Sequence, residues 1–262
     1  MLYIAHQKKQ ELLLPHITSV ILLFVVAFIS GFINVGAGGG SSLTLPTLIF
    51  LGLNSSLANG TNRVGVIMQN IAAIYSFKKS NYSQFRLSLK LSLLTLPGAI
   101  AGAILAVKLN DELFQKILGI VMIGIIISMF LPKAKNTKDG ENNQKISWWV
   151  YISMFCVGFY GGFLQVGVGF LIMASIQHLM KLNLIYVNMH KVFIIVFFSV
   201  PALLIFAFTG NVNWFWGIML GFGNAAGGWW SAKLSIKKGE KLIKIVLVIA
   251  IFIMALDLLN IT

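Results

Sequence analysis

The sequence predicts an all-α polytopic membrane protein built from two inverted repeats of about five helices each, with glycine-broken helices at the repeat interface. Three observations lead to this prediction: the composition, the length of the apolar segments, and an internal match between the halves. Of the 262 residues, 58% are hydrophobic and 10% are charged, whereas a soluble domain is usually about 45–50% apolar and about 25% charged. Such a chain cannot bury its apolar surface in one water-soluble core, so we expect lipid around it.

Eight apolar segments are each close to the ~20 residues that a helix needs to cross about 30 Å of hydrocarbon. They cover residues 17–36, 57–77, 87–107, 114–131, 147–167, 184–209, 212–230 and 241–259. Two shorter runs, 41–53 and 168–180, follow glycine-rich stretches and are long enough for broken spans or for halves of re-entrant hairpins. Helices are expected because backbone groups in lipid must be paired within their own segment.

One polar stretch divides the chain. Residues 133–146 have the composition of a solvated linker. We therefore expect an N-terminal transmembrane repeat at 1–132, a cytoplasmic linker at 133–146 and a C-terminal transmembrane repeat at 147–262. Lys8 and Lys9 precede the first apolar run, which we interpret as a retained span rather than a cleaved signal peptide.

The two halves match when the sequence is moved along itself by 129 positions without a gap. Gly38 then falls on Gly167 (167 − 38 = 129), and Asn59 falls on Asn188. The other informative matches are Gly40 with Gly169, Ala73 with Ala202, Phe77 with Phe206, Gly98 with Gly227, Lys108 with Lys237 and Asp111 with Glu240. Matched glycine, asparagine and charged positions in one register indicate an internal repeat.

Charge predicts how the halves are oriented. The net charge is +13, and the basic residues lie in short loops between apolar runs. This placement is the positive-inside signal of membrane topology and argues against nucleic acid as a partner. The loop 78–90 is basic while its counterpart 209–213 has no charge, and the bias reverses at the next loop, where 233–244 is basic. Equivalent loops are therefore expected on opposite sides, with both termini outside, although Lys8 and Lys9 argue against an outside N-terminus.

Two glycine-rich segments are the first candidate for the site. Gly31–Gly40 and Gly158–Gly169 each interrupt an apolar run. Glycine costs roughly 1 kcal/mol relative to alanine in a helix interior, but it frees N–H groups and lets a ligand approach, and helix N-termini suit anions. Paired interruptions are typical of transporter sites, while close helix packing is the alternative. The candidate residues are Asn34, Gly38, Gly39, Gly40, Gln165, Gly167 and Gly169.

Basic residues open two long apolar helices. Arg63 and Lys191 would bind an anion, because a guanidinium can form two hydrogen bonds to an oxyanion and an ammonium supplies a point charge. Snorkelling to the interface is the alternative. The neighbouring candidates are Asn59, Thr61, Asn62, Asn188 and His190.

The segments Gly31–Pro46 and Ala58–Arg63, together with the second glycine-rich half, resemble the TauE/SafE sulfite exporter family, also called the sulfonate uptake permease family. The resemblance covers nearly the whole chain and implies a carrier of sulfite, sulfonates or small organosulfur anions. The second half departs from the fuller glycine pattern, because Gln165 and Val168 stand where the first half has Gly36 and Gly39. The substrate is therefore expected to differ from that of named members.

We expect a secondary transporter that moves a small anion across the inner membrane by alternating access, with no cofactor. An anion channel of the same architecture and a non-transporting structural subunit are the alternatives. An enzyme is not expected, because the spans hold no paired Asp, no zinc motif and one cysteine, Cys156, which also excludes an intrachain disulfide. Coupling to protons and assembly as a homodimer are further possibilities that the sequence leaves open.

Overall fold

The computed structural model describes residues 17–130, 147–180 and 182–234, and every regular element in these ranges is an α-helix. The helices are α2 (Ile17–Ala37), α3 (Ser41–Phe50), α4 (Ser55–Lys79), α5 (Phe85–Lys108), α6 (Asp111–Phe130), α7 (Trp148–Phe163), α8 (Val168–Met180), α9 (Leu184–Phe208) and α10 (Trp214–Leu234). The all-α prediction is confirmed for these residues. The expected linker at 133–146 and the expected span at 241–259 lie outside the described residues.

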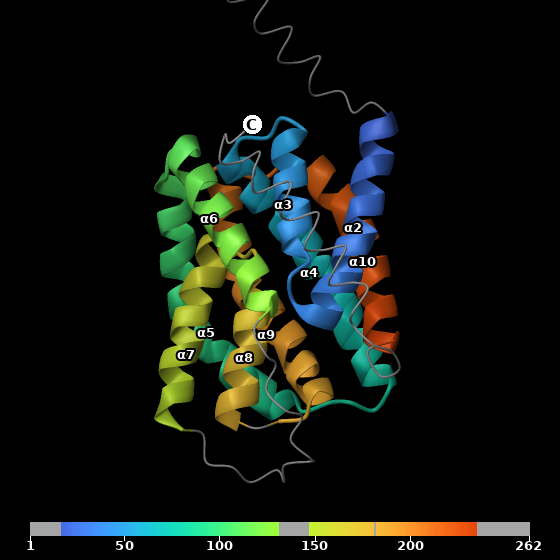
Figure 1. The fold of residues 1–262 in the computed structure, drawn as a ribbon, viewed down its shortest axis with the longest axis vertical. Helices are drawn as coiled ribbons and strands as arrows, with labels where there is room; N and C mark the ends of the chain where they lie inside the picture. The colour runs from blue at the N-terminus through green and yellow to red at the C-terminus, as the bar shows by residue number, and fades with distance from the viewer. Residues whose placement is uncertain (1–16, 131–146, 181, 235–262) are drawn as a thin grey trace, which may run out of the picture.

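Two helical hairpins enter the bundle from its opposite ends (Figure 1). In that view α2 descends from the upper end and α3 returns upward, whereas α7 rises from the lower end and α8 returns downward. Helices α3 and α8 contain 10 and 13 residues, so at 1.5 Å per residue they are only about 15 and 20 Å long. The short runs after the glycines are therefore the second halves of re-entrant hairpins.

Both hairpins turn through a residue with left-handed backbone geometry, which is a common way to end a helix. Gly38 has φ +99° and its N–H bonds to the carbonyl of Ile33 at 3.2 Å. Gln165 has φ +64° and its N–H bonds to the carbonyl of Tyr160 at 3.4 Å. The two tips meet, since a Cβ placed on Gly38 would lie 2.6 Å from the carbonyl carbon of Gly169.

The long helices repeat in the register that the sequence predicted. Helix α4 covers 55–79 and α9 covers 184–208, and each begins after an asparagine whose side chain accepts a hydrogen bond from the first turn, Asn54 in one half and Asn183 in the other. The turns that follow also correspond, because Asn81 and Gly210 both have positive φ. The match between the halves therefore extends to the backbone of these segments.

The first helices of the two halves correspond with a different offset. Gly31 of α2 packs against the backbone of Asn224 on α10, and Gly158 of α7 packs against the backbone of Thr95 on α5. Thr95 and Asn224 correspond in the ungapped alignment (224 − 95 = 129), whereas Gly31 and Gly158 do not (158 − 31 = 127). The alignment therefore shifts by two positions in α2 and α7. The two extra residues of the second half lie after its turn, because the start of α8 is 16 residues before the start of α9 (184 − 168 = 16) and the start of α3 is 14 residues before the start of α4 (55 − 41 = 14).

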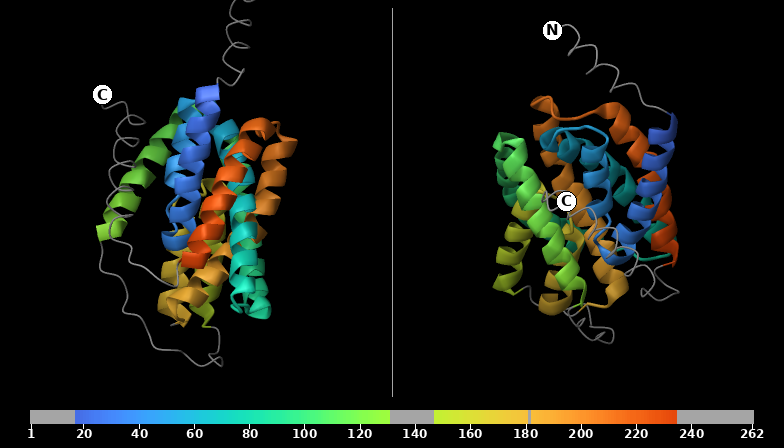
Figure 2. Two further views of the ribbon diagram at one scale, coloured as in Figure 1. Left: turned by 90° about the vertical axis from the view of Figure 1, so that its right-hand side faces the viewer. Right: turned by 45° about the horizontal axis from the view of Figure 1, so that its top comes forward.

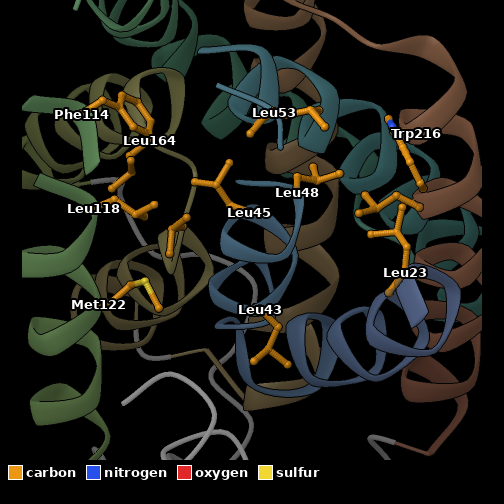
Figure 3. Packing of buried hydrophobic residues seen from close by; sticks show 14 of the residues in the cluster. Leu23, Leu43, Leu45, Leu48, Leu53, Phe114, Leu118, Met122, Leu164 and Trp216 are labelled. Carbon is orange, nitrogen blue, oxygen red and sulfur yellow. The ribbon is translucent and has the colours of Figure 1, made fainter. Parts of the chain in front are cut away.

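An apolar core joins the first hairpin to its neighbours (Figure 3). Leu45 and Leu48 of α3 lie between Leu118 of α6 on one side and Leu23 of α2 and Trp216 of α10 on the other. These side chains are at most 4% exposed. The core therefore fixes the position of α3 between α6 on one side and α2 and α10 on the other.

Large apolar side chains also cover the outside of the bundle. Three helices are long and apolar enough to cross a membrane, namely α2, α5 and α9. Exposed side chains such as Ile21, Leu204 and Phe222 lie on α2, α9 and α10. An apolar surface of this extent requires lipid as the solvent. In contrast, α4 is polar and buried along much of its length, so it is an inner helix.

Charged residues divide between the two ends of the bundle. The 79–85 connection, the start of α7 and the end of α10 lie toward the lower end in Figure 1, and the 209–213 connection lies at the upper end. The lower end carries Lys78, Lys79, Arg86, Lys90 and Lys233, while the upper end has Lys108 and Lys116 beside Asp111 and Glu112. Figure 2 shows the two ends of the bundle from two further sides. The positive-inside rule predicts that the lower end faces the cytoplasm.

Cysteine labelling tests this orientation. We expect Ser83→Cys to resist a membrane-impermeant thiol reagent in intact cells and Thr209→Cys to react, both in a Cys156→Ala background. Both positions are exposed, and they lie at opposite ends. After cell lysis both should react. Labelling of Ser83→Cys in intact cells would reverse the assignment.

Helix contacts through glycine should be intolerant of even one methyl group. A Cβ on Gly227 would collide with the backbone oxygen of Phe28, whereas a Cβ on Gly124 would meet nothing within 4 Å. We expect Gly227→Ala to destabilise the fold by about 1–3 kcal/mol through overpacking. Gly124→Ala should be neutral or slightly stabilising. The measurement is the thermal unfolding midpoint in detergent, and equal midpoints for the two variants would contradict the packing described above.

Candidate functional site

The broken end of α7 is capped by side chains of α4. Arg63 is fully buried, and its Nη1 donates to the carbonyl of Gly161 at 3.1 Å while its Nη2 donates to the carbonyl of Gly162. Asn59, one turn earlier, donates from Nδ2 to the carbonyl of Phe163 at 2.8 Å. The last carbonyls of a helix have no partner within the helix, so these contacts satisfy groups that no water would reach.

Further contacts fix the Arg63 side chain. Its Nη2 lies 3.4 Å from Oδ1 of Asn59, and its guanidinium carbon lies 4.7 Å from the centre of the Phe206 ring. An aromatic face attracts a cation at this distance. The Nε group of Arg63 is buried and has no hydrogen-bond partner. One donor of the guanidinium is therefore available.

The broken end of α2 is capped by α9 in the same manner. Lys191 is fully buried, and its ammonium donates to the carbonyls of Asn34 at 3.1 Å and Val35 at 2.8 Å and to Oδ1 of Asn188 at 2.7 Å. The sulfur of Met173 lies 3.5 Å away. Three acceptor oxygens require three donor hydrogens, so this geometry fits the ammonium form.

The two caps are equivalent and join the halves. Asn34 corresponds to Gly161 at the offset of the first helices (161 − 34 = 127), and Val35 corresponds to Gly162 in the same way. Each basic residue thus contacts the corresponding carbonyls of the opposite half. The ungapped counterpart of Arg63 is Val192, so Lys191 performs this task from one position earlier.

The caps contain positive charge without a negative partner. Within the described ranges the acidic residues are Asp111 and Glu112, both exposed at the upper end of α6. The ion pair in those ranges joins Lys116 to Glu112. Charge in the membrane interior is costly and usually marks a functional site. Arg63 and Lys191 are balanced only by carbonyl and amide dipoles, which leaves the region attractive to an anion.

Unused hydrogen-bonding atoms surround the hairpin tips. Helices α3 and α8 both start beside the contact between Gly38 and Gly169. Of their first N–H groups, that of Ser42 bonds to the carbonyl of Gly39 and that of Phe170 bonds to the carbonyl of Gly167. Oγ of Ser42 and Nδ2 of Asn62 are buried and unpartnered, while Oδ1 of Asn62 accepts from Thr44 at 2.7 Å. These donors, with Nε of Arg63, could bind an oxyanion.

Gln165 combines strain with an unused polar atom. A non-glycine residue in the left-handed region costs roughly 1–2 kcal/mol, and such strain is concentrated at functional sites. Its Nε2 donates to Oγ of Ser199 at 2.9 Å, but its Oε1 is buried without a partner. Gln165 is the structural equivalent of Gly38 (165 − 38 = 127). The ungapped alignment instead paired Gln165 with Gly36, because it does not contain the shift of two positions in the first helices.

The glycines after the two turns have structural roles. Gly39 precedes α3, and the carbonyl of Gly40 accepts from Oγ of Ser30 at 2.7 Å. Gly167 has φ +71°, and a Cβ there would meet the side chain of Ile125. These residues allow the turns to be tight.

Two predicted site residues point elsewhere. Oγ1 of Thr61 accepts from the backbone N–H of Asn213 at 2.9 Å, in the connection between α9 and α10. The ring of His190 bonds to Oγ of Ser88 at 2.8 Å and to Oε1 of Gln84 at 3.1 Å, toward α5. Neither side chain faces the hairpin ends.

The predicted set omitted a buried amide pair between α4 and α10. Asn224 and Gln69 are at most 1% exposed, and neither amide has a hydrogen-bond partner. A Cβ on Gly65 would lie 2.8 Å from Nδ2 of Asn224, and a Cβ on Gly228 would lie 2.7 Å from Cγ of Gln69. The asparagine within the small-residue run 221–228 was the available signal. No group of three potential metal ligands occurs among the described residues.

Comparisons with known proteins agree with this architecture. The family model described as "Sulfite exporter TauE/SafE" matches residues 23–258. The chain is similar to the probable membrane transporter protein ORF9 of Sinorhizobium sp, with 28% identity covering 90% of this chain and 91% of the relative. It is also similar to the probable membrane transporter proteins YfcA of Escherichia coli K12 (29% identity; 91% and 88% covered) and YunE of Bacillus subtilis 168 (25%; 86% and 90%). No solved structure matches the chain.

Removal of a cap should destabilise the protein. Arg63→Ala leaves the carbonyls of Gly161 and Gly162 without donors, and hydrogen bonds to charged groups contribute about 1.5–3 kcal/mol each. We expect a clearly lower thermal unfolding midpoint in detergent. The control is Lys116→Ala, which removes an exposed cation and should leave the midpoint unchanged. Equal midpoints for the two variants would show that the cap contributes nothing.

Proposed function

The chain belongs to the sulfite exporter TauE/SafE family of membrane transporters, and we propose that it carries a small anion across the inner membrane. The proposed substrate class is sulfite, a sulfonate or another organosulfur anion. The observation that carries this proposal is the pair of buried cations, Arg63 and Lys191, with no buried carboxylate among the described residues. A permanent positive potential at this depth lowers the cost of moving an anion from water into the membrane.

The proposed binding position is the meeting point of the hairpin tips. An oxyanion there would lie at the N-termini of α3 and α8, and the positive ends of the two helix dipoles favour an anion. Ser42, Asn62 and Arg63 each supply a buried donor without a present partner. The contact between Gly38 and Gly169 fills this position now, so the tips would separate when substrate binds.

We further propose that the halves form an inverted repeat, and that this arrangement lets the binding position open to one side of the membrane at a time. Two observations support this arrangement: the hairpins enter from opposite ends (Figure 1), and two of the contacts between the halves occur twice with the roles exchanged. Helix α2 packs on α10 as α7 packs on α5, and α4 caps α7 as α9 caps α2. Movement of one hairpin would open one side while the other hairpin stays closed. The closed tips favour this carrier over a channel, which needs a continuous path.

Flux measurements in proteoliposomes test the proposal. We expect saturable flux of radiolabelled sulfite, thiosulfate or a small sulfonate. Ser42→Ala should raise KM by about 10- to 100-fold if its hydroxyl binds the anion, because a hydrogen bond to a charged group contributes about 1.5–3 kcal/mol. The variant should fold normally, since Oγ of Ser42 bonds to no protein group.

Lys116→Ala is the matched control and should transport like the parent protein. Flux that does not saturate, at rates far above carrier turnover, would identify a channel. Absence of flux for every anion, from folded and inserted protein, would leave a structural subunit as the remaining interpretation.

A further inference from the structure

The two equivalent caps use different chemistry for the same task. Arg63 binds the last carbonyls of α7 through a guanidinium, and Lys191 binds the corresponding carbonyls of α2 through an ammonium. A guanidinium stays protonated in proteins, whereas an ammonium can release its proton. The Arg63 cap is therefore permanent, and the Lys191 cap can be weakened by loss of a proton.

We propose that Lys191 is the proton-binding site that couples anion transport to the proton gradient. This inference rests on the proposed transport function and names the residue that links it to protons. In the described state the ammonium donates to three oxygens, two of them carbonyls of α2. A neutral amine has two hydrogens and a lone pair, so loss of the proton leaves one of these oxygens facing a lone pair.

Proton binding and hairpin position are linked in both directions. The oxygens of Asn34, Val35 and Asn188 favour the charged form of Lys191 only while the end of α2 stays beside α9. A proton therefore binds more tightly to the capped state, and by reciprocity it favours that state. Acidic conditions should hold the α2 end in place, and alkaline conditions should release it. The proton passes from Nζ to water that is admitted when the end of α2 moves away from α9, and no bond other than N–H changes.

No acidic side chain competes for this role in the described helices around Lys191. The carbonyls come from α2, which has no titratable side chain, and Met173 comes from α8, whose titratable residue is the exposed His178. His190 is next in sequence, but its ring bonds to Ser88 and Gln84 on the side of α5. The other titratable groups of the helices packed around α9 are Arg63, Tyr75, Lys78, Lys79, Arg86, Lys90, Lys108, Tyr151, Cys156, Tyr160 and Tyr186.

Hydrogen exchange of the full-length protein in lipid nanodiscs tests the site without a substrate. Exchange of the amides at 33–42 should rise about tenfold or more between weakly acidic and weakly alkaline buffer, after correction for the intrinsic pH dependence. A tenfold change corresponds to about 1.4 kcal/mol. Lys191→Arg keeps a cap but cannot release a proton, so the rise should disappear. Arg63→Lys is the converse variant, and it should add a pH-dependent rise at 160–167.

Controls keep the test decisive. His190→Gln replaces the neighbouring titratable ring and should retain the rise at 33–42. Lys191→Met has no cap at any pH, so its amides at 33–42 should exchange rapidly in both buffers. This variant replaces Lys191→Arg in the test if the arginine side chain cannot be accommodated. A rise that persists in both Lys191 variants would overturn the inference.

Flux measurements separate this inference from the transport function itself. In proteoliposomes with a proton gradient, sulfite flux by the parent protein should follow the gradient, and flux by Lys191→Arg should not. Sulfite flux that still follows the gradient in Lys191→Arg would refute the proton site while supporting transport. Absence of flux with a pH-dependent rise at 33–42 would refute transport while supporting the proton site.

Discussion

The fold depends on one constraint, which is that two helices end inside the membrane where no water can satisfy their carbonyls. Each unpaired backbone group there costs several kcal/mol. The end of α7 is satisfied completely, because Leu164 and Gln165 bond to the carbonyl of Tyr160 while Arg63 and Asn59 bond to the three that follow. Lys191 satisfies two of the last carbonyls of α2, those of Asn34 and Val35. The buried cations thus have a structural task as well as the proposed functional one.

This constraint also explains why neither half is independent. Both of these caps are supplied by the opposite half, and the glycine contacts that bring α2 to α10 and α7 to α5 cross the same boundary. Helix α4 adds a further contact between the halves, because Thr61 accepts from the backbone N–H of Asn213 in the 209–213 connection. A displacement of one hairpin must therefore act on side chains that belong to the other half.

Much of this architecture was predictable from periodicity and composition. Apolar length predicted the long helices, the glycine clusters predicted the two breaks, and matched Asn and Gly predicted the register in which the long helices repeat. The partners of Arg63 and Lys191 were not predictable, because a helix end offers carbonyls that leave no mark in the sequence. The shift of α2 against α7 was also hidden, since it depends on the lengths of the short helices α3 and α8 and of the connections that follow them. The run 221–228 marks Asn224 as unusual in the sequence, but its position beside Gly65 of α4 appears only in the structure.

The caps imply an order of events in the proposed transport cycle. A hairpin cannot leave its cap until another group satisfies the freed carbonyls, and the freed cation needs an acceptor in place of those carbonyls. A bound anion can accept from Arg63 or Lys191, while water admitted from the open side can donate to the exposed carbonyls. The hairpin on the closed side has neither, because no water reaches it. Only one hairpin can therefore move at a time, so the capping chemistry itself would enforce alternating access.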